Sequence, residues 1–278
     1  MSAAARMASS SSPAPRNDGA AVMRKALSRF LAGCMAISAL APSGLGARTP
    51  APCAAGTLYL TIDTGWGREA EQIAEILKRR SIRATLFVAQ EPTHRGDKSL
   101  DPGWAAFWRA RAAEGHVFAS HTDRHWYFRG DPAPGIVRFV SYDKKNEDRL
   151  DQAAMCRELS APIERLRAAV PDAVVLPLWR APGGITTPNA LRMAESCGLR
   201  HQGWTQNGFL GDELNSDAHP NASLRDRVLR SVRDGEVLVM HWGVRSRKDP
   251  YANILEDVLA GLQARGFCFG QLNAEGRR

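Results

Sequence analysis

From residue 57 onward the chain alternates between two hydrophobic periods, and this alternation constrains its fold more than any other feature. Short apolar runs typical of buried strands are separated by longer segments whose apolar residues recur every three to four positions, as on one face of a helix. Strands separated by helices imply a parallel sheet. Seven strands in roughly 220 residues favour a barrel over an open doubly wound sheet. The predicted strands are 58–62, 84–88, 116–119, 174–179, 200–204, 236–240 and 267–272.

The intervening segments predict helices, and local signals indicate where several of them begin or end. Pro102 suits the first turn of a helix, and Gly198 and Gly266 suit helix ends. Pro162 should kink or divide the longest helix. Two stretches without a clear period, 126–145 and 209–221, are predicted loops. The predicted helices are 68–80, 101–114, 146–170, 188–197, 223–233 and 253–265.

The composition favours one enzyme-sized domain, which we place at 55–273. With 278 residues, of which 44% are hydrophobic, the chain can bury a substantial core. The net charge is +8, but the Lys and Arg residues are scattered rather than grouped, which indicates a solvated surface and not a nucleic-acid site. No Gly-x-Gly-x-x-Gly pattern follows a predicted strand, so a dinucleotide site is not expected.

Residues 1–47 do not resemble a fold. Residues 2–15 are rich in Ser, Ala and Pro, which predicts disorder, and the true start could be Met23. After Met23 come two basic residues, an apolar stretch at 26–41 and small residues at 42–47, the layout of a secretory signal. The sequence therefore predicts an exported protein of the periplasm or the extracellular space.

Two other readings of this leader are weaker. The apolar stretch is shorter than the roughly 20 residues that span a membrane, and Arg29 interrupts it, so stable insertion is not expected. The residues 31–34 resemble a lipoprotein box ending at Cys34, but the apolar stretch before it is too short.

Removal of the leader would leave four cysteines, an even number that suits an oxidising compartment: Cys53, Cys156, Cys197 and Cys268. Cys53 precedes the first predicted strand and Cys268 lies in the last, so a bridge between the two ends of the domain is one option. The spacing alone leaves the connectivity open.

Two histidines, His121 and His125, follow the third predicted strand. Side chains four residues apart on a helical turn project to the same side, so the two imidazoles could bind one cation such as zinc. The alternative is that they are two unrelated polar side chains.

Other polar residues follow further predicted strands. Because the strand ends of a parallel α/β barrel open onto one face, these residues should gather there. Taken one at a time, each could be a turn residue, a surface cation or a buried core histidine. With the two histidines the set is Asp63, His121, His125, Arg180, Asp212 and His241.

The motifs containing these residues resemble the NodB-homology polysaccharide deacetylases of carbohydrate esterase family 4, and the resemblance spans 58–272. Thr-Ile-Asp-Thr-Gly at 61–65 resembles the family's Thr-Phe-Asp-Asp-Gly, and 121–125 matches its His-Ser/Thr-x-x-His. Residues 180–184 resemble Arg-x-Pro-x-Gly, and Leu-Val-Met-His at 238–241 resembles Leu-x-x-His. The loop 204–212 is a looser match to an Asp- and Trp-containing motif.

The resemblance implies a distorted (β/α)7 barrel of the NodB-homology type, forming a single domain, and a metal-dependent hydrolase. His121 and His125 would bind a divalent metal, with zinc first and cobalt as an alternative. By analogy Asp63 is the general base and His241 the general acid. The other implied catalytic roles are Arg180 orienting Asp63, Gly183 donating its N–H to the oxyanion and Asp212 in the fourth motif.

The first motif departs from the family pattern at Thr64, where the usual residue is an Asp that serves as third metal ligand. A neutral hydroxyl is a poor zinc ligand, so Thr64 is a doubtful one. Three outcomes are open: a weak metal site that still turns over, a site completed by another carboxylate, or a degenerate binding module. Retention of Asp63, Arg180 and His241 favours a working hydrolase.

The predicted activity is removal of N-acetyl or O-acetyl groups from a cell-wall or extracellular polysaccharide by hydrolysis of linear amide C–N bonds. Peptidoglycan comes first, since Asp-Thr-Gly-Trp at 63–66 resembles a variant motif of peptidoglycan deacetylases. The alternatives are a non-catalytic glycan-binding protein and an amidohydrolase of the same superfamily acting on a small cyclic amide. Three tryptophans near the motifs are predicted to stack on sugar rings: Trp126, Trp204 and Trp242.

Overall fold

The computed structural model describes residues 53–276, and their centre is the parallel sheet around β1 (Gly56–Asp63). One edge of β1 pairs with β9 (Val237–His241). Its other edge pairs with β10 (Phe267–Gly270) in the first half and with β2 (Thr85–Val88) in the second. The sheet continues through β3 (Val117–Ser120), β7 (Val175–Trp179) and β8 (Arg200–His201). All seven predicted strands are present, which confirms the predicted α/β fold class.

The sheet curls, and an irregular segment joins its two outer strands within the described residues. After β8, residues 205–210 run beside β9, where the Thr205 N–H donates to the Val237 carbonyl at 3.2 Å and the Leu210 N–H to the Val239 carbonyl at 3.3 Å. A short 3-10 helix, η3 (Gln206–Gly208), interrupts this contact. The predicted barrel is therefore distorted, because β8 and β9 are connected through an irregular segment and not by direct strand pairing.

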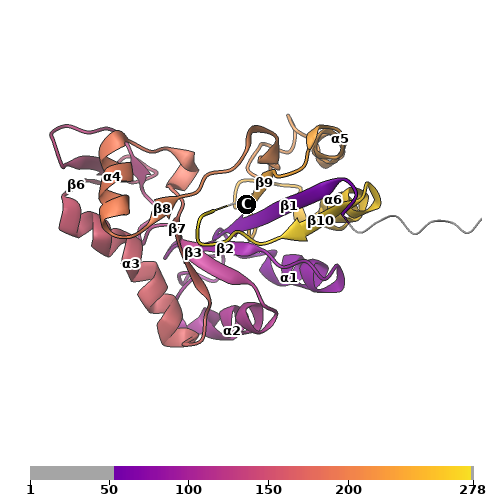
Figure 1. Cartoon of the computed structure of the whole chain (residues 1–278), viewed down its shortest axis with the longest axis horizontal. Coiled ribbons are helices and arrows are strands. Elements are labelled where there is room, and N and C mark those ends of the chain that lie inside the picture. The colour runs from indigo at the N-terminus through magenta and orange to yellow at the C-terminus, as the bar shows by residue number, and fades with distance from the viewer. Residues whose placement is uncertain (1–52, 277–278) are drawn as a thin grey trace, which may run out of the picture. The chain divides into compact units, whose positions relative to one another are not determined.

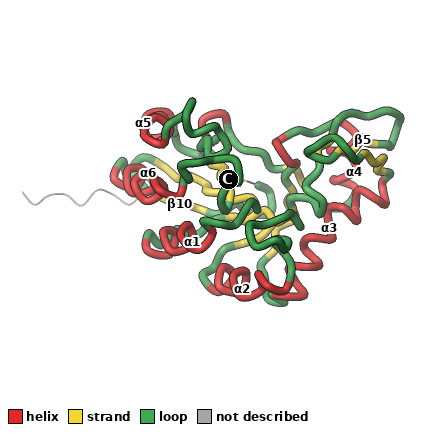
Figure 2. The backbone as a smooth tube through the Cα atoms, turned by 180° about the vertical axis from the view of Figure 1, so that it is seen from behind, coloured by secondary structure: helices red, strands yellow, loops and turns green. Residues whose placement is uncertain are grey.

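Helices surround the sheet, as Figures 1 and 2 show. The face of the first helix predicted to be apolar is buried, with Ile73 at 1% exposure and Leu77 at 0%. The α-helices are α1 (Ala70–Arg79), α2 (Ala105–Ala113), α3 (Gln152–Ala169), α4 (Pro188–Ser196), α5 (Asn221–Ser231) and α6 (Ala252–Ala264). Two further 3-10 helices are η1 (Pro102–Trp104) and η2 (Pro182–Gly184). No helix within 53–276 is long and apolar enough to cross a membrane.

The stretch 126–150 differs from the sequence prediction. Instead of a long loop and the first turn of a helix, it contains a three-stranded antiparallel sheet of β4 (Tyr127–Phe128), β5 (Val137–Val140) and β6 (Glu147–Leu150). This small sheet lies beside α4, at one side of the described fold (Figures 1 and 2). The helical prediction for 146–150 was wrong because pairing with β5 outweighs local helical preference there.

Pro162 lies inside α3 and does not divide it. A proline has no N–H, so the carbonyl four residues earlier, that of Glu158, loses its helical donor. In this chain the Glu158 carbonyl accepts a hydrogen bond from the Asp123 N–H at 2.9 Å instead. The helix stays continuous since the carbonyl freed by Pro162 has a partner from the loop after β3.

Two disulfides fix the connectivity that the sequence left open. Cys53 pairs with Cys268 and joins the start of β1 to β10, as one option anticipated. Cys156 pairs with Cys197 and joins α3 to the end of α4. The leader predicted at 1–47, with Cys34 and the candidate start Met23, lies outside the described residues.

Candidate active site

Asp63 and His241 are neighbours because β1 and β9 end in register. The two residues are direct partners in the parallel ladder, each at the carboxyl end of its strand. Asp63 is 2% exposed, while His241 is partly buried. The residues predicted to act as base and acid therefore stand side by side on the face where loops of parallel α/β folds form active sites.

Arg180, which directly follows β7, holds Asp63 in place. Its Nη1 donates to Asp63 Oδ1 at 2.7 Å and to Thr61 Oγ1 at 2.8 Å, and Arg180 itself is fully buried. Burial by itself would raise the pKa of Asp63, but the nearby Arg180, His121 and His241 together hold that pKa below its usual value. Asp63 is thus an ionised carboxylate at neutral pH.

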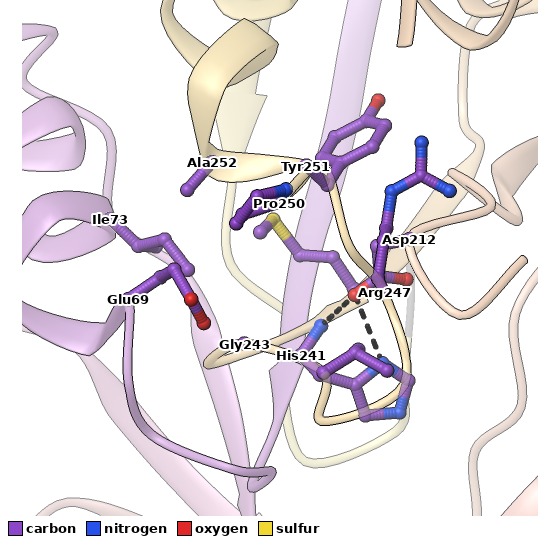
Figure 3. Close-up of a pocket in the computed structure, with 11 residues that line it drawn as sticks. Glu69, Ile73, Asp212, His241, Gly243, Arg247, Pro250, Tyr251 and Ala252 are labelled. Carbon is purple, nitrogen blue, oxygen red and sulfur yellow. Dashed lines mark hydrogen bonds and ion pairs between the residues drawn. The ribbon is translucent and has the colours of Figure 1, made fainter. Parts of the chain in front are cut away.

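His241 is held on both sides by carboxylates. Asp212 Oδ2 accepts from the backbone N–H of His241 at 2.7 Å and lies 3.1 Å from its Nδ1, and Figure 3 shows both contacts converging on one oxygen. Glu213 Oε1 lies 3.3 Å from Nε2. Burial would lower the pKa of His241, but Asp212, Glu213 and Asp63 outweigh it and raise the pKa to about 10. His241 is therefore an imidazolium at neutral pH.

Behind His241 lies a cavity of about 10 Å³, drawn in Figure 3. Three of the residues that line it have a buried oxygen without a hydrogen-bond partner among the described residues: Glu69 Oε2, Asp212 Oδ1 and the Tyr251 hydroxyl. A cavity of this size holds about one water molecule when polar groups surround it.

His121 and His125 face each other through their Nε2 atoms, which are 3.2 Å apart. His121 Nδ1 lies 3.0 Å from the Arg180 carbonyl, an acceptor, so Nδ1 carries the proton and the lone pair is on Nε2. Asp63 Oδ2 lies 3.5 Å from the same Nε2. Burial lowers the pKa of His121 to about 4, which keeps the ring neutral, the form that binds metals.

The two histidines meet through loop conformation and not on a helical turn, which corrects the sequence interpretation. Thr122 and His125 both have positive φ, 68° and 54°, so the chain from 121 to 125 is a compact loop. Glu158 of α3 accepts from the Arg124 N–H at 2.7 Å and from its Nε at 2.8 Å. This contact and the Asp123 bond to the Glu158 carbonyl hold the loop against α3.

The donor set for a metal is incomplete. Thr64 is 1% exposed, and its Oγ1 accepts the Ala89 N–H at 3.1 Å, so the third-ligand position holds a neutral, already bonded hydroxyl. Within 53–276 no group of three or more His, Cys, Asp or Glu side chains is arranged to hold a metal ion. The residues fit two positions of a divalent metal site, those of His121 and His125, and do not provide a third ligand.

Gly183 has a left-handed conformation that the site requires. Its φ is 62°, and a Cβ there would lie 2.8 Å from Cε1 of Tyr127. A side chain at Gly183 would therefore be strained and would displace the Tyr127 ring, which is also 6.4 Å from the His125 ring. The 3-10 turn of η2 thus packs closely against the aromatic residue beside the histidine pair.

The predicted sugar-stacking role of Trp242 was wrong. Trp242 is 2% exposed and packs its ring edge-on against Phe107 at 5.2 Å, so no ring face is open to a sugar. Its side chain belongs to the core behind the sheet. Trp126 and Trp204 are both partly buried against core clusters, with Phe139 beside Trp126 and Phe209 beside Trp204.

Two carboxylates of the site were not anticipated. Glu213 contacts His241, and Glu91 Oε2 lies 3.8 Å from His125 Nδ1 while its Oε1 is buried without a hydrogen-bond partner among the described residues. The only sequence signals were adjacency to Asp212 for Glu213 and a place three residues after a strand for Glu91. Neither position belongs to the motifs that indicated the site.

Comparison with known proteins identifies the family of the chain. The family model of polysaccharide deacetylases matches residues 52–201, more than half of the chain. Among proteins of curated function none gives a significant match.

Three solved structures illustrate the likeness in fold. A peptidoglycan N-acetylglucosamine deacetylase superposes with a TM-score of 0.58 at 19% identity, covering 80% of this chain and 88% of that one. A family 4 acetyl xylan esterase from Clostridium thermocellum, in complex with a cobalt ion, gives 0.56 at 16% identity, covering 77% and 87%. A family 4 pseudoenzyme from Bacillus anthracis gives 0.56 at 18% identity, covering 79% and 64%.

At these identities the structural likeness establishes the fold, and the family model extends over β1, the His121–His125 loop and Arg180. The curled parallel sheet, the motif order and the match to the family model lead to one conclusion: the chain belongs to the polysaccharide deacetylase family of hydrolases.

Proposed function

We propose that this protein removes acetyl groups from an N-acetylated cell-wall or extracellular polysaccharide, with peptidoglycan as the first choice of substrate. The observation that carries this proposal is the side-by-side placement of Asp63 and His241, each with its own charged partner. An ionised carboxylate next to an imidazolium is the pairing that amide hydrolysis by general base and general acid requires.

Asp63 acts as the base. Arg180 occupies its Oδ1 and leaves Oδ2 directed toward His121, where the attacking water would lie. Because the pKa of Asp63 is below its usual value, Asp63 is ionised at neutral pH and Oδ2 can accept a proton from that water. Arg180 is a positioning residue, since its contact is with Asp63 and not with the reacting atoms.

His241 acts as the acid. Its Nε2 proton is directed away from Asp212 and toward Glu213, so it is available at the mouth of the site for the leaving amine. Asp212 keeps the imidazolium in one orientation and charged. The backbone N–H of Gly183, in the turn beside Tyr127, is the proposed donor to the oxyanion.

His121 and His125 are the proposed ligands of a divalent metal, zinc first and cobalt as the alternative. Such a metal, when bound, would polarise the acetyl carbonyl and lower the pKa of a coordinated water. Support comes from the two converging Nε2 atoms and from the cobalt ion in the related acetyl xylan esterase. Glu91, beside Nδ1 of His125, would orient that ring from behind.

Peptidoglycan as substrate is supported by the Asp-Thr-Gly-Trp motif at 63–66 and by the structural likeness to a peptidoglycan deacetylase. Export to the periplasm or the extracellular space, supported by the signal-like pattern at 23–47, would bring the enzyme to that polymer.

A second candidate function is glycan binding without turnover. Thr64 favours it, because the position lacks the carboxylate that would complete the metal shell, and one structure of similar fold is a pseudoenzyme. Sugar binding in the absence of acetate release would identify this function.

The test is acetate release by the purified protein from peptidoglycan and from chitooligosaccharides, measured before and after chelation and after zinc or cobalt is added back. Release that chelation stops and metal restores would establish the metal-dependent deacetylase. Absence of release from both substrates with metal supplied would reject it, and metal content by elemental analysis would then show whether the histidine pair binds an ion.

A further inference from the structure

The antiparallel sheet β4–β5–β6 carries the most exposed large hydrophobic side chain in 53–276. Tyr142, in the turn between β5 and β6, is 79% exposed, whereas most aromatic residues of the described chain are buried or half-buried. An aromatic ring in this position costs free energy in water unless something covers it. A tyrosine suits a partner with one apolar face and with edges that stay hydrated.

The turn that presents Tyr142 is built from specific hydrogen bonds. The Ser141 N–H donates to the Asn146 carbonyl and the Asn146 N–H to Ser141 Oγ, both at 2.9 Å. Ser141 Oγ in turn donates to Asp143 Oδ1 at 2.8 Å. These bonds close the turn on both sides of Tyr142, so its backbone is ordered before any ligand arrives and less entropy is lost on binding.

Tyr142 is continuous with the candidate active site. Its ring lies 6.1 Å from that of Tyr127, and the Tyr127 ring lies 6.4 Å from that of His125. Tyr127 also packs against Gly183, the proposed oxyanion donor. The two tyrosine rings therefore connect the histidine pair to the β5–β6 turn, and we call them the tyrosine row.

The chemistry of this row matches a carbohydrate chain. The C–H face of a pyranose ring packs on an aromatic ring while its hydroxyl groups remain in water or bind polar side chains. The Arg129 guanidinium lies 4.7 Å from the centre of the Tyr127 ring and is exposed, so it can donate to sugar hydroxyls or to an acidic substituent beside the row. A protein partner would instead need a larger apolar patch than two rings supply.

We propose that Tyr142, next to Tyr127, forms an additional sugar subsite that binds a ring of the polysaccharide further along the chain than the residue whose acetyl group reacts. Tyr127 makes ring contacts with both His125 and Tyr142, and no ring contact joins His125 to Tyr142 among the described residues, so Tyr142 is the farther tyrosine from the histidine pair. The subsite favours long chains over short ones. This inference rests on the proposed function for its ligand class but not on turnover.

The test compares the binding of chitobiose and chitopentaose, and of soluble peptidoglycan fragments of matching lengths, to the full protein by calorimetry. Tyr142→Ala should weaken binding of the longer chains about five- to tenfold, the value of one aromatic contact, and leave that of the disaccharides unchanged. Tyr142→Phe keeps the ring and should bind as the wild type does. Val174→Ala, an exposed apolar residue just before β7 at the opposite end of the sheet, is the matched control.

If the wild type and Tyr142→Ala bind long chains equally, the subsite proposal is overturned. It is also overturned if the wild-type protein binds neither the chitooligosaccharides nor the peptidoglycan fragments. Equal weakening for short and long chains would also overturn it, because Tyr142 would then act on the reacting centre. Acetate release is measured separately: length-dependent binding that needs Tyr142, with no acetate released, would keep the subsite and reject the deacetylase. Binding of a protein in place of glycan would contradict the proposal.

Discussion

The candidate site has an acid–base half and a histidine half, and the two differ in how many of the groups that each needs are present. In the acid–base half, Asp63 contacts Arg180 and His241 contacts Asp212, so each of these groups has an oppositely charged partner. In the other half, the Nε2 atoms of His121 and His125 lie 3.2 Å apart, and the third position is the neutral Thr64.

The difference follows from where the residues lie. Asp63 and His241 are fixed by the register of two parallel strands, and Arg180 comes directly after a third. The histidine pair depends on a loop with two left-handed residues, held by Glu158 of α3. Because strand register fixes one half and a loop fixes the other, acid–base chemistry and metal binding can vary separately in this site.

The largest effect is expected in the acid–base half, from Asp63→Asn. Loss of the general base should lower acetate release by about three orders of magnitude while metal binding persists. Kinetics on peptidoglycan fragments and elemental analysis of the variant measure the two quantities. Asp148→Asn, which changes a half-exposed carboxylate paired with Arg124, is the control. Undiminished turnover in Asp63→Asn would remove Asp63 from the mechanism.

In the histidine half, His125→Ala should abolish metal binding, since one imidazole without a carboxylate cannot retain the ion. Calorimetric titration with zinc gives the affinity directly. His94→Ala, a histidine that contacts the Trp66 carbonyl away from the pair, should bind as the wild type does. Unchanged zinc affinity in His125→Ala would mean that the metal binds elsewhere or that the pair is not its site.

Asp212→Asn tests the charge partner of His241. Without the carboxylate, the pKa of His241 should fall from about 10 toward its usual value of about 6.5, which NMR titration of the ring would follow. A histidine whose folded pKa is raised adds stability that is complete below the unfolded pKa of about 6.5 and is lost as pH rises through about 10.

The free energy of unfolding should therefore differ most between wild type and Asp212→Asn below about pH 6.5, and the difference should disappear above about pH 10. A difference that grows with pH would show that Asp212 does not act through the charge of His241.

Thr64→Asp should give the histidine half the third metal ligand that it lacks. An aspartate there can still accept the Ala89 N–H and adds the missing carboxylate, so zinc affinity should rise by about tenfold or more. Thr64→Val, which keeps the shape without any oxygen ligand, should not gain affinity. If the two variants bind zinc equally, position 64 does not face the metal.

The smallest effect is expected from Glu213→Gln. Glu213 is half-exposed, so solvent weakens its interaction with Nε2 of His241, and the pKa of His241 should fall less than in Asp212→Asn. The same NMR titration measures it. A larger fall than in Asp212→Asn would reverse the assignment of the main partner.

Much of this arrangement could be predicted from residue patterns. All seven strands of the parallel sheet were anticipated, and all except β8, the polar pair Arg200–His201, are short apolar-rich runs between helical segments. Asp63, Arg180 and His241 were placed on one face, since residues after parallel strands share it. The antiparallel sheet of β4, β5 and β6 at 127–150 was missed, because its strands are short and their stability depends on pairing with one another.

The sequence by itself determined the fold class and the placement of Asp63, Arg180 and His241 on one face, because strands and their ends follow from the hydrophobic period. Only the tertiary structure decided the rest: the loop that brings His121 to His125, the approach of Glu213 and Glu91, the burial of Trp242 and the exposure of Tyr142. These features arise from contacts between residues far apart in the chain, such as Glu158 with Arg124, and no local pattern encodes them.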